Sequence, residues 1–218
     1  MKEKKSKGLS VPSYSLGEEL CNAVSHGLGA GLSAAGLVLM LVRAAGPLAV
    51  TCVSLFGASM ILLYTMSCLY HALSPRLAGK KVLRVLDHCN VFLLVFGTYI
   101  PVSLLGVPGA AGWTLFGIVA FFTVLGIVLT AVDLERFQLA AVICQLLSGW
   151  SILIGFSGLL RTMGAPGLVW LVAGGVLYSI GAVLYGLGKK KQYRHSLFHV
   201  FCLLGSFCHF WAVYRYLL

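Results

Sequence analysis

Charged side chains are scarce in this sequence. Asp, Glu, Lys and Arg make up 10% of its 218 residues, whereas 59% are hydrophobic. A water-soluble domain needs a polar surface, and this composition does not supply one, so a soluble fold is excluded. Acidic residues are rarer than basic ones, with 6 Asp and Glu against 16 Lys and Arg, and the formal net charge is +10.

Basic runs interleaved with exposed aromatic residues, which are typical of nucleic-acid-binding proteins, are also missing. The Lys and Arg residues stand in short polar segments between apolar runs. That distribution is typical of membrane proteins, where it determines orientation. We therefore expect no nucleic-acid partner.

Paired cysteines and a cleavable leader are not indicated either. The seven cysteines form no Cys-x-x-Cys pair and lie in or beside apolar segments, where cysteine behaves as a small hydrophobic side chain. The first apolar run, from Leu20 to Val42, is too long for a signal-peptide core. The sequence therefore predicts no disulfide framework and a first run that is retained as a membrane span.

Long apolar runs fill almost the whole chain. Because a membrane-spanning helix needs about 20 apolar residues, seven segments fit, and a turn containing Gly164 and Pro166 separates the fifth from the sixth. They are predicted at residues 20–42, 47–73, 85–106, 113–131, 139–160, 168–187 and 195–218. The expected fold is an all-α, multi-pass protein of the inner or plasma membrane, with an N-terminal segment over residues 1–19 and a seven-helix membrane domain over residues 20–218.

The basic residues also predict the orientation. If the seven segments alternate across the membrane, 13 of the 16 Lys and Arg residues fall on the side of the N-terminus and 3 on the other side. Cytoplasmic loops are enriched in Lys and Arg, so we expect a cytoplasmic N-terminus and a C-terminus outside. An even number of spans would break this alternation.

Two histidines one helical turn apart mark the start of the last apolar segment. His195 and His199 are spaced i, i+4, so their imidazole rings lie on one helix face and can reach one metal ion. The predicted topology places His71, at the end of the second segment, at the same depth near the cytoplasmic face. Three histidines with one open position are typical of catalytic zinc, which activates a water molecule near neutral pH.

Two further polar residues are expected at this depth. Asp87, at the start of the third segment, would orient the water or act as a general base, and Ser67 would contact His71 or a substrate oxygen. His88 is about 100° around the helix from Asp87 and is expected not to face the same site. Other interpretations stay open, because Asp87 can pair with Arg84 and Ser67 can bond to a carbonyl of its own helix.

Glu19, Asn22 and His26 are spaced i, i+3, i+7 and form one stripe at the same membrane face. One interpretation is that this stripe hydrogen-bonds to the metal-binding histidines and orients them. The other is that it lines the inner mouth of the bundle and packs the first helix. We prefer the first interpretation.

Cys202 lies on the same helix face as His199 and is a possible soft fourth ligand, which would close the site and make it structural. His209 is 14 residues from His195, about 21 Å along a helix, and is too far away to share its metal. A membrane histidine can also serve only in hydrogen bonding between helices.

In combination, these motifs resemble the haemolysin III family, the bacterial branch of the progestin and adipoQ receptor superfamily. The matching motifs are Glu19-x-x-Asn22-x-x-x-His26, Ser67-x-x-x-His71, Asp87 and His195-x-x-x-His199, within a resemblance that extends from Leu16 to Leu218. It implies seven helices and zinc on the three histidines, with Asp87 holding the metal-bound water and Ser67 beside it. It also implies kinship with alkaline ceramidases, which hydrolyse lipid amides.

The residues and the resemblance together indicate a membrane zinc protein that hydrolyses a lipid amide or ester and takes part in membrane homeostasis. One alternative is a sensor or regulator of membrane state with structural zinc. Another is a pore-forming cytolysin, as the family name suggests, although the fourth to sixth segments offer little polarity beyond Gln145, Ser148 and Ser151. Hormone reception is not expected, since the long N-terminal region of the animal receptors is missing.

Overall fold

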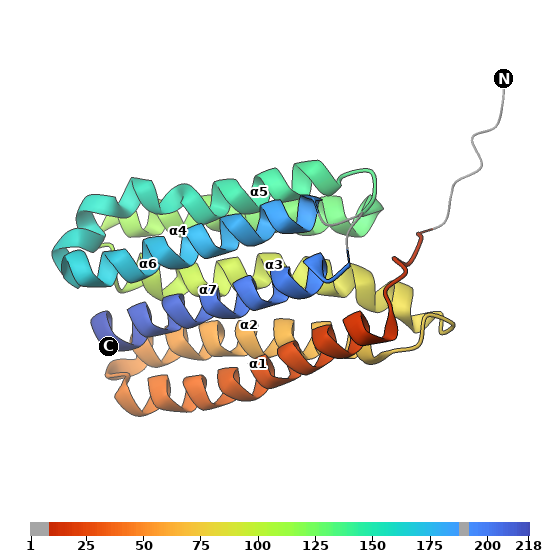
Figure 1. Ribbon diagram of the computed structural model, residues 1–218. Coiled ribbons are helices and arrows are strands. Elements are labelled where there is room, and N and C mark those ends of the chain that lie inside the picture. Colours follow the sequence, from red (N-terminus) through yellow and green to blue (C-terminus); the bar gives the residue numbers. More distant parts are fainter. Residues whose placement is uncertain (1–8, 188–191) are drawn as a thin grey trace, which may run out of the picture.

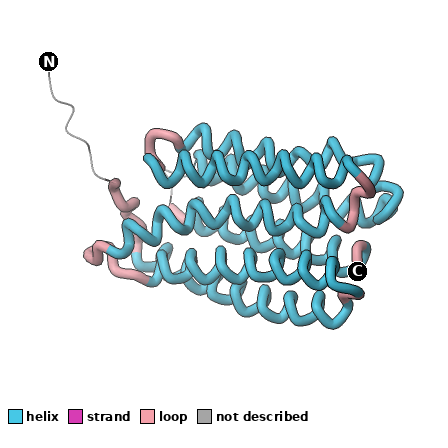
Figure 2. The backbone as a smooth tube through the Cα atoms, turned by 180° about the vertical axis from the view of Figure 1, so that it is seen from behind, coloured by secondary structure: helices cyan, strands magenta, loops and turns pink. Residues whose placement is uncertain are grey.

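The computed structural model describes residues 9–187 and 192–218, and within these ranges the regular elements are helices. They are α1 (Leu16–Arg43), α2 (Gly46–Ala72), α3 (Gly79–Leu104), α4 (Ala110–Asp133), α5 (Gln138–Trp150), the 3-10 helix η1 (Ser151–Gly155), α6 (Phe156–Leu187) and α7 (Arg194–Tyr216). They lie side by side in an elongated bundle (Figure 1), with the connecting loops gathered at its two ends (Figure 2). The prediction of an all-α fold is confirmed. The basic residues at positions 2–7 and 189–191 lie outside the described ranges.

The outer surface of the bundle is apolar. Large hydrophobic side chains are exposed along the helices, among them Leu32 of α1, Phe121 of α4 and Val169 of α6, each more than 60% exposed. Six stretches of the described residues are long and apolar enough to cross a membrane. Such a surface is suited to lipid rather than to water.

The longest of the six stretches, Gln138–Gly186, has 49 residues and contains α5, η1 and most of α6. It is interrupted at Gly164, which has a left-handed φ of 66° with ψ of 176°, and Pro166 follows. Glycine adopts such a φ without strain. The chain turns back at this break, and the rest of α6 runs beside α5 (Figure 1).

The helix expected over residues 139–160 is not continuous. It ends at Trp150, and Ser151–Gly155 form a 3-10 turn. The reason is the Tyr99 hydroxyl of α3, which donates to the Gly149 carbonyl at 2.5 Å and accepts the Ile152 N–H at 3.1 Å. These two backbone groups would otherwise bond within the helix, and a side chain inserted in this way breaks the regular pattern.

The first helix begins at Leu16, four residues before the apolar run from which it was predicted. Ser15 caps it, because its hydroxyl accepts the Glu18 N–H at 3.3 Å while the Glu18 carboxylate accepts the Ser15 N–H at 2.9 Å. This reciprocal pair satisfies backbone donors that the first helical turn leaves free. Glu19 is therefore part of the helix and has a fixed direction.

Close packing brings α1 against α2 and α7. A Cβ atom at Gly29 of α1 would lie 2.6 Å from Leu203 of α7 and 3.0 Å from Tyr64 of α2. A larger residue at this position would require Leu203 to shift, so glycine favours the close approach of α1 to both neighbours.

Candidate metal centre

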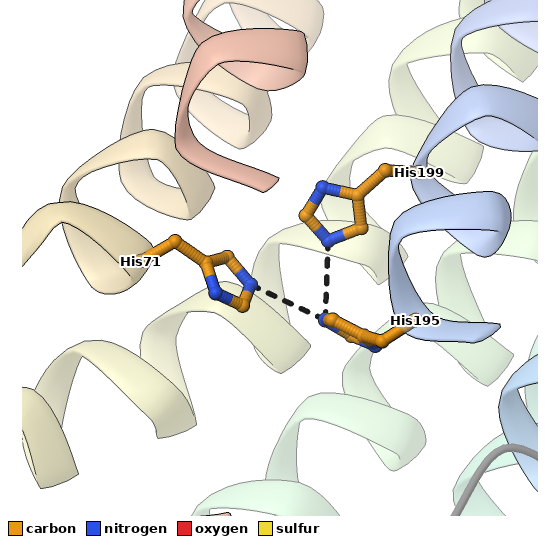
Figure 3. Close-up of side chains that lie close together, drawn as sticks. All are labelled: His71, His195 and His199. Carbon is orange, nitrogen blue, oxygen red and sulfur yellow. Dashed lines mark hydrogen bonds between the residues drawn. The ribbon is translucent and has the colours of Figure 1, made fainter. Parts of the chain in front are cut away.

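Three histidines from two helices meet at the end of the bundle where α1 and α7 begin. His71 lies in the last turn of α2, and His195 and His199 lie in the first turns of α7 (Figure 3). The Nε2 of His195 is 3.2 Å from the Nε2 of His71 and 3.1 Å from the Nε2 of His199. One ligand atom from each ring lies within 4.8 Å of the other two, and His71 and His199 are buried.

The hydrogen bonds of His71 favour a cation at the centre of this cluster. Its Nδ1 is 2.6 Å from Oε2 of Glu19, and an ionised carboxylate only accepts, so Nδ1 carries the proton. In the neutral imidazole, which is the form that binds metals, Nε2 of His71 then presents a lone pair to the other two rings. Imidazole nitrogens 2.0–2.1 Å from one tetrahedral zinc ion lie about 3.4 Å apart, close to the separations observed, so the residues fit a bound metal ion.

The polar stripe of α1 lies against the cluster. Besides the Glu19 contact, the Asn22 side-chain amide is 3.4 Å from Nδ1 of His71. The His26 ring stacks on His199 with 3.6 Å between the ring centres and an angle of 12°. The sequence placed these three residues at the same membrane face, and the structure brings all three next to the histidines.

Lys80, one of the basic residues between the second and third apolar segments of the sequence, is part of the same network. It stands in the first turn of α3 and has no exposed surface. Its Nζ lies 2.5 Å from Oε1 of Glu19 and 2.8 Å from the carbonyl oxygen of Leu73. The sequence carries no signal for this contact, because a lysine beside three other basic residues is typical of a membrane-flanking loop.

Asp87 and Ser67 lie near the cluster without belonging to it. Asp87 is 8% exposed and Ser67, one turn before His71 in α2, is 1% exposed. Among the described residues, the cluster with metal-ligand spacing contains the three histidines and not Asp87. The alternative partner of Asp87, Arg84, instead pairs with Glu135 at 3.1 Å.

A cavity of about 150 Å³ adjoins the histidines and is bounded by α3, α4, α5, α6 and α7. His195 and Asp87 line one end, and His209, 14 residues further along α7, lines the other. The wall between them is mainly apolar, with side chains such as Val95 and Leu146. A slender apolar molecule could therefore lie in it with one end beside the histidines.

His88 also lines this cavity, which corrects the expectation that it would face away from Asp87. Its Nδ1 is 2.8 Å from the Arg84 carbonyl oxygen, and its Nε2 is 2.9 Å from the Tyr185 hydroxyl. An angle of about 100° between neighbouring helix positions does not separate the two side chains, because the cavity extends around this side of α3.

The proposed fourth ligand, Cys202, is buried and lines the cavity. Among the described residues it is not part of the histidine cluster. The structure therefore favours three protein ligands over four.

Residues before α1 cover the histidines from the loop side. The Tyr14 ring stacks on His195, with 5.1 Å between the centres and an angle of 18°, and burial raises the pKa of its phenol. Ser10 is fastened to the α4–α5 loop, because its hydroxyl donates to Glu135 at 2.6 Å. That hydrogen bond, together with Arg84, lowers the pKa of the Glu135 carboxyl.

Comparison with known proteins matches this chain to one family of membrane proteins and to several of its relatives. The family described as "Haemolysin-III related" matches residues 14–210. Hemolysin-3 of Bacillus cereus is 36% identical over 205 residues, which cover 92% of both chains, and the Hemolysin-3 homolog of Bacillus subtilis is 34% identical over 206 residues, covering 93% of this chain and 96% of its own. The adiponectin receptor protein of Drosophila melanogaster is 24% identical over 184 residues, which are 69% of this chain and 37% of its own. No solved structure matches.

Proposed function

The chain belongs to the haemolysin III family, and from this premise we propose that it is a zinc-dependent hydrolase of a lipid amide or ester that takes part in membrane homeostasis. It is a multi-pass protein of the cell membrane, related to the adiponectin receptors. One observation carries the proposal: three imidazole nitrogens converge beside an apolar cavity, and a carboxylate lines the same cavity.

His71, His195 and His199 would hold the zinc ion. Bound by three neutral ligands, zinc supplies a Lewis acid and a water molecule with a pKa near 7. Glu19 keeps the proton of His71 on Nδ1, and His26 supports the ring of His199 by stacking on it. The tautomer of His71 and the orientation of the His199 ring are thereby held, which is the usual task of such partners.

Asp87 is assigned the role of general base. Its carboxylate lines the cavity at the end where His195 also lies, and a carboxylate at this point can take a proton from an attacking water molecule. Ser67 lies one turn before His71 on the same helix and is assigned a contact to the substrate oxygen or to His71.

The cavity is suited to an acyl chain. Its wall is mainly apolar and includes His195 and His209, which lie 14 residues apart on α7, about 21 Å along the helix at 1.5 Å per residue. A lipid whose chain lies in this cavity has its amide or ester group beside the three histidines. Membrane lipid is therefore the proposed substrate.

The topology that goes with this function has seven passages, with the N-terminus in the cytoplasm and the C-terminus outside. The 49-residue stretch Gln138–Gly186 would be about 74 Å long as a straight helix, more than twice the roughly 30 Å of a hydrocarbon core. The stretch is broken at Gly164, and in the proposed topology each side of the break makes one passage. With seven passages, 13 of the 16 Lys and Arg residues fall on the membrane side where α1 begins, and 3 fall on the other side. The three histidines lie at the same end of the bundle as the start of α1.

The test is a purified protein in detergent with its zinc content measured and a broad panel of lipids offered. We expect about one zinc per chain and release of fatty acid from an amide- or ester-linked lipid. His199→Ala should lose zinc and activity, while Asp87→Asn should keep most of the zinc and lose activity. His209→Ala is the matched control for zinc content alone, because it removes a histidine of the same helix that donates to Leu171 and is not a proposed ligand, whereas its position in the cavity wall makes its activity no control.

Two results would decide against hydrolysis. One is the absence of zinc-dependent release across the panel. The other is a variant that binds no zinc and still supports membrane homeostasis in the cell as well as the native protein does. A protein that binds zinc without turnover would instead be a sensor or regulator of membrane state, with the metal as a structural link between α2 and α7.

A further inference from the structure

Lys80 is a fully buried lysine in a membrane protein, and such a residue is rare because its charge is costly to bury. Its ammonium group has partners from both neighbouring helices. Glu19 of α1 lies at 2.5 Å, the carbonyl oxygen of Leu73 at the end of α2 at 2.8 Å, and the Tyr70 ring centre at 5.2 Å. Lys80 therefore joins the start of α3 to the start of α1 and the end of α2.

Glu19 stands between Lys80 and His71 and uses its two oxygens separately. Oε1 accepts from Lys80 and Oε2 accepts from Nδ1 of His71. Because the two oxygens belong to one planar group, holding Oε1 also fixes the direction in which Oε2 points. The position of the His71 ring thus depends on Lys80 through Glu19.

We propose that Lys80 is a positioning residue for the metal centre. By holding Glu19, it keeps Nδ1 of His71 hydrogen-bonded and directs the Nε2 lone pair of His71 toward His195. This inference rests on the metal binding of the proposed function and not on hydrolysis.

A purely structural ion pair would behave differently. Removing it would destabilise the protein, because a buried carboxylate loses its partner. That loss of stability would not depend on whether Glu19 can still orient His71. A positioning role predicts a specific loss of metal affinity that disappears once Glu19 has been changed. Zinc affinity and protein stability must therefore be measured separately.

The experiment compares zinc dissociation constants, measured by competition with a chelator in detergent, for native protein and Lys80→Met. Partners of metal ligands typically contribute about 10–100-fold to affinity, so a loss in this range is expected. Lys80→Arg retains a cationic donor and should bind zinc more tightly than Lys80→Met. Thermal midpoints of the zinc-free proteins report the stability.

Arg84→Met is the matched control. Arg84 is also buried, stands four residues later on α3 and is paired with a carboxylate, but its partners are Glu135 and the Ser10 carbonyl. Its loss should leave zinc affinity within about threefold of native, below the 10–100-fold range that marks a partner of a metal ligand. An equal loss in the two variants would show that any buried cation of α3 has this effect, and would overturn the proposal.

The deciding comparison uses the Glu19→Gln background. If Lys80 acts through Glu19, Lys80→Met should cause no further loss of zinc affinity there, since coupled residues are not additive. The Glu19→Gln/Lys80→Met double variant leaves no buried charge without a partner. It can therefore be measured even if Lys80→Met alone is too unstable to purify. Equal losses in both backgrounds, or native affinity in Lys80→Met, overturn this inference alone, whereas a native protein that binds no zinc overturns the proposed function as well.

Discussion

Tyr99→Phe tests the interruption between α5 and α6. The substitution removes one hydroxyl and leaves the ring, so the packing of a side chain that is 5% exposed is retained. It deletes two hydrogen bonds to the backbone, one at 2.5 Å to the Gly149 carbonyl and one at 3.1 Å from the Ile152 N–H. Both backbone groups then need new partners.

The size of the effect follows from these two contacts. Hydrogen bonds between membrane helices contribute about 0.6 kcal/mol each on average and up to about 1.7 kcal/mol, so the free energy of unfolding should fall by roughly 1–3 kcal/mol. For a chain of 150–250 residues, each 1 kcal/mol corresponds to about 2–4 °C in the thermal midpoint. We therefore expect the midpoint to fall by roughly 2–12 °C, with part of the loss recovered if residues 149–155 close into an α-helix.

The assay is thermal unfolding in detergent, followed by circular dichroism, of native protein, Tyr99→Phe and Tyr214→Phe. Tyr214 is the control, because its ring stacks on Phe210 and lies under Arg43, and both ring contacts survive loss of the hydroxyl. Identical midpoints for Tyr99→Phe and native protein would refute the account of the 3-10 turn.

Three other predictions concern the ligand set, the loop side and the topology. Cys202→Ala should keep its full zinc content in elemental analysis, and loss of the metal would make Cys202 a ligand. The pKa of Glu135 is lowered in the folded state by Ser10 and Arg84, so its stabilising contribution is present above its usual value of 4.5 and disappears as the pH falls through the lower folded value. Glu135→Gln should therefore flatten the acid side of the stability profile in a pH-dependent melting series, and an unchanged profile would contradict this role. A topology reporter fused after α7 should be extracytoplasmic and one placed in the loop before α7 cytoplasmic, and the reverse result would contradict the orientation.

Composition and periodicity were sufficient to predict the all-α membrane fold. The chain is 59% hydrophobic, and its long apolar runs are suited to lipid. In lipid the backbone N–H and C=O groups of such a run have no water to bond to, and an α-helix satisfies them within the segment. The turn at Gly164 and Pro166 was predictable for a similar reason, because both residues act through the local backbone. The i, i+4 spacing of His195 and His199 likewise places both rings on one face in any α-helix.

The sequence could not predict contacts between residues far apart in the chain. The helix expected over residues 139–160 is interrupted because a hydroxyl some 50 positions earlier reaches its backbone, and no local pattern carries that information. His88 was assigned away from the site by helix geometry alone, yet the cavity formed by five helices reaches it.

Lys80 shows the same limit most clearly. In the sequence it is one basic residue of a loop that orients the membrane protein, and that interpretation explains its charge without a partner. Only the packing of α1, α2 and α3 decides that its ammonium group is buried against Glu19. The sequence by itself determined which residue types meet at this end of the bundle, because spacing along each helix sets depth. The tertiary structure decided which of them touch, because contact between helices depends on how each helix is rotated against its neighbours.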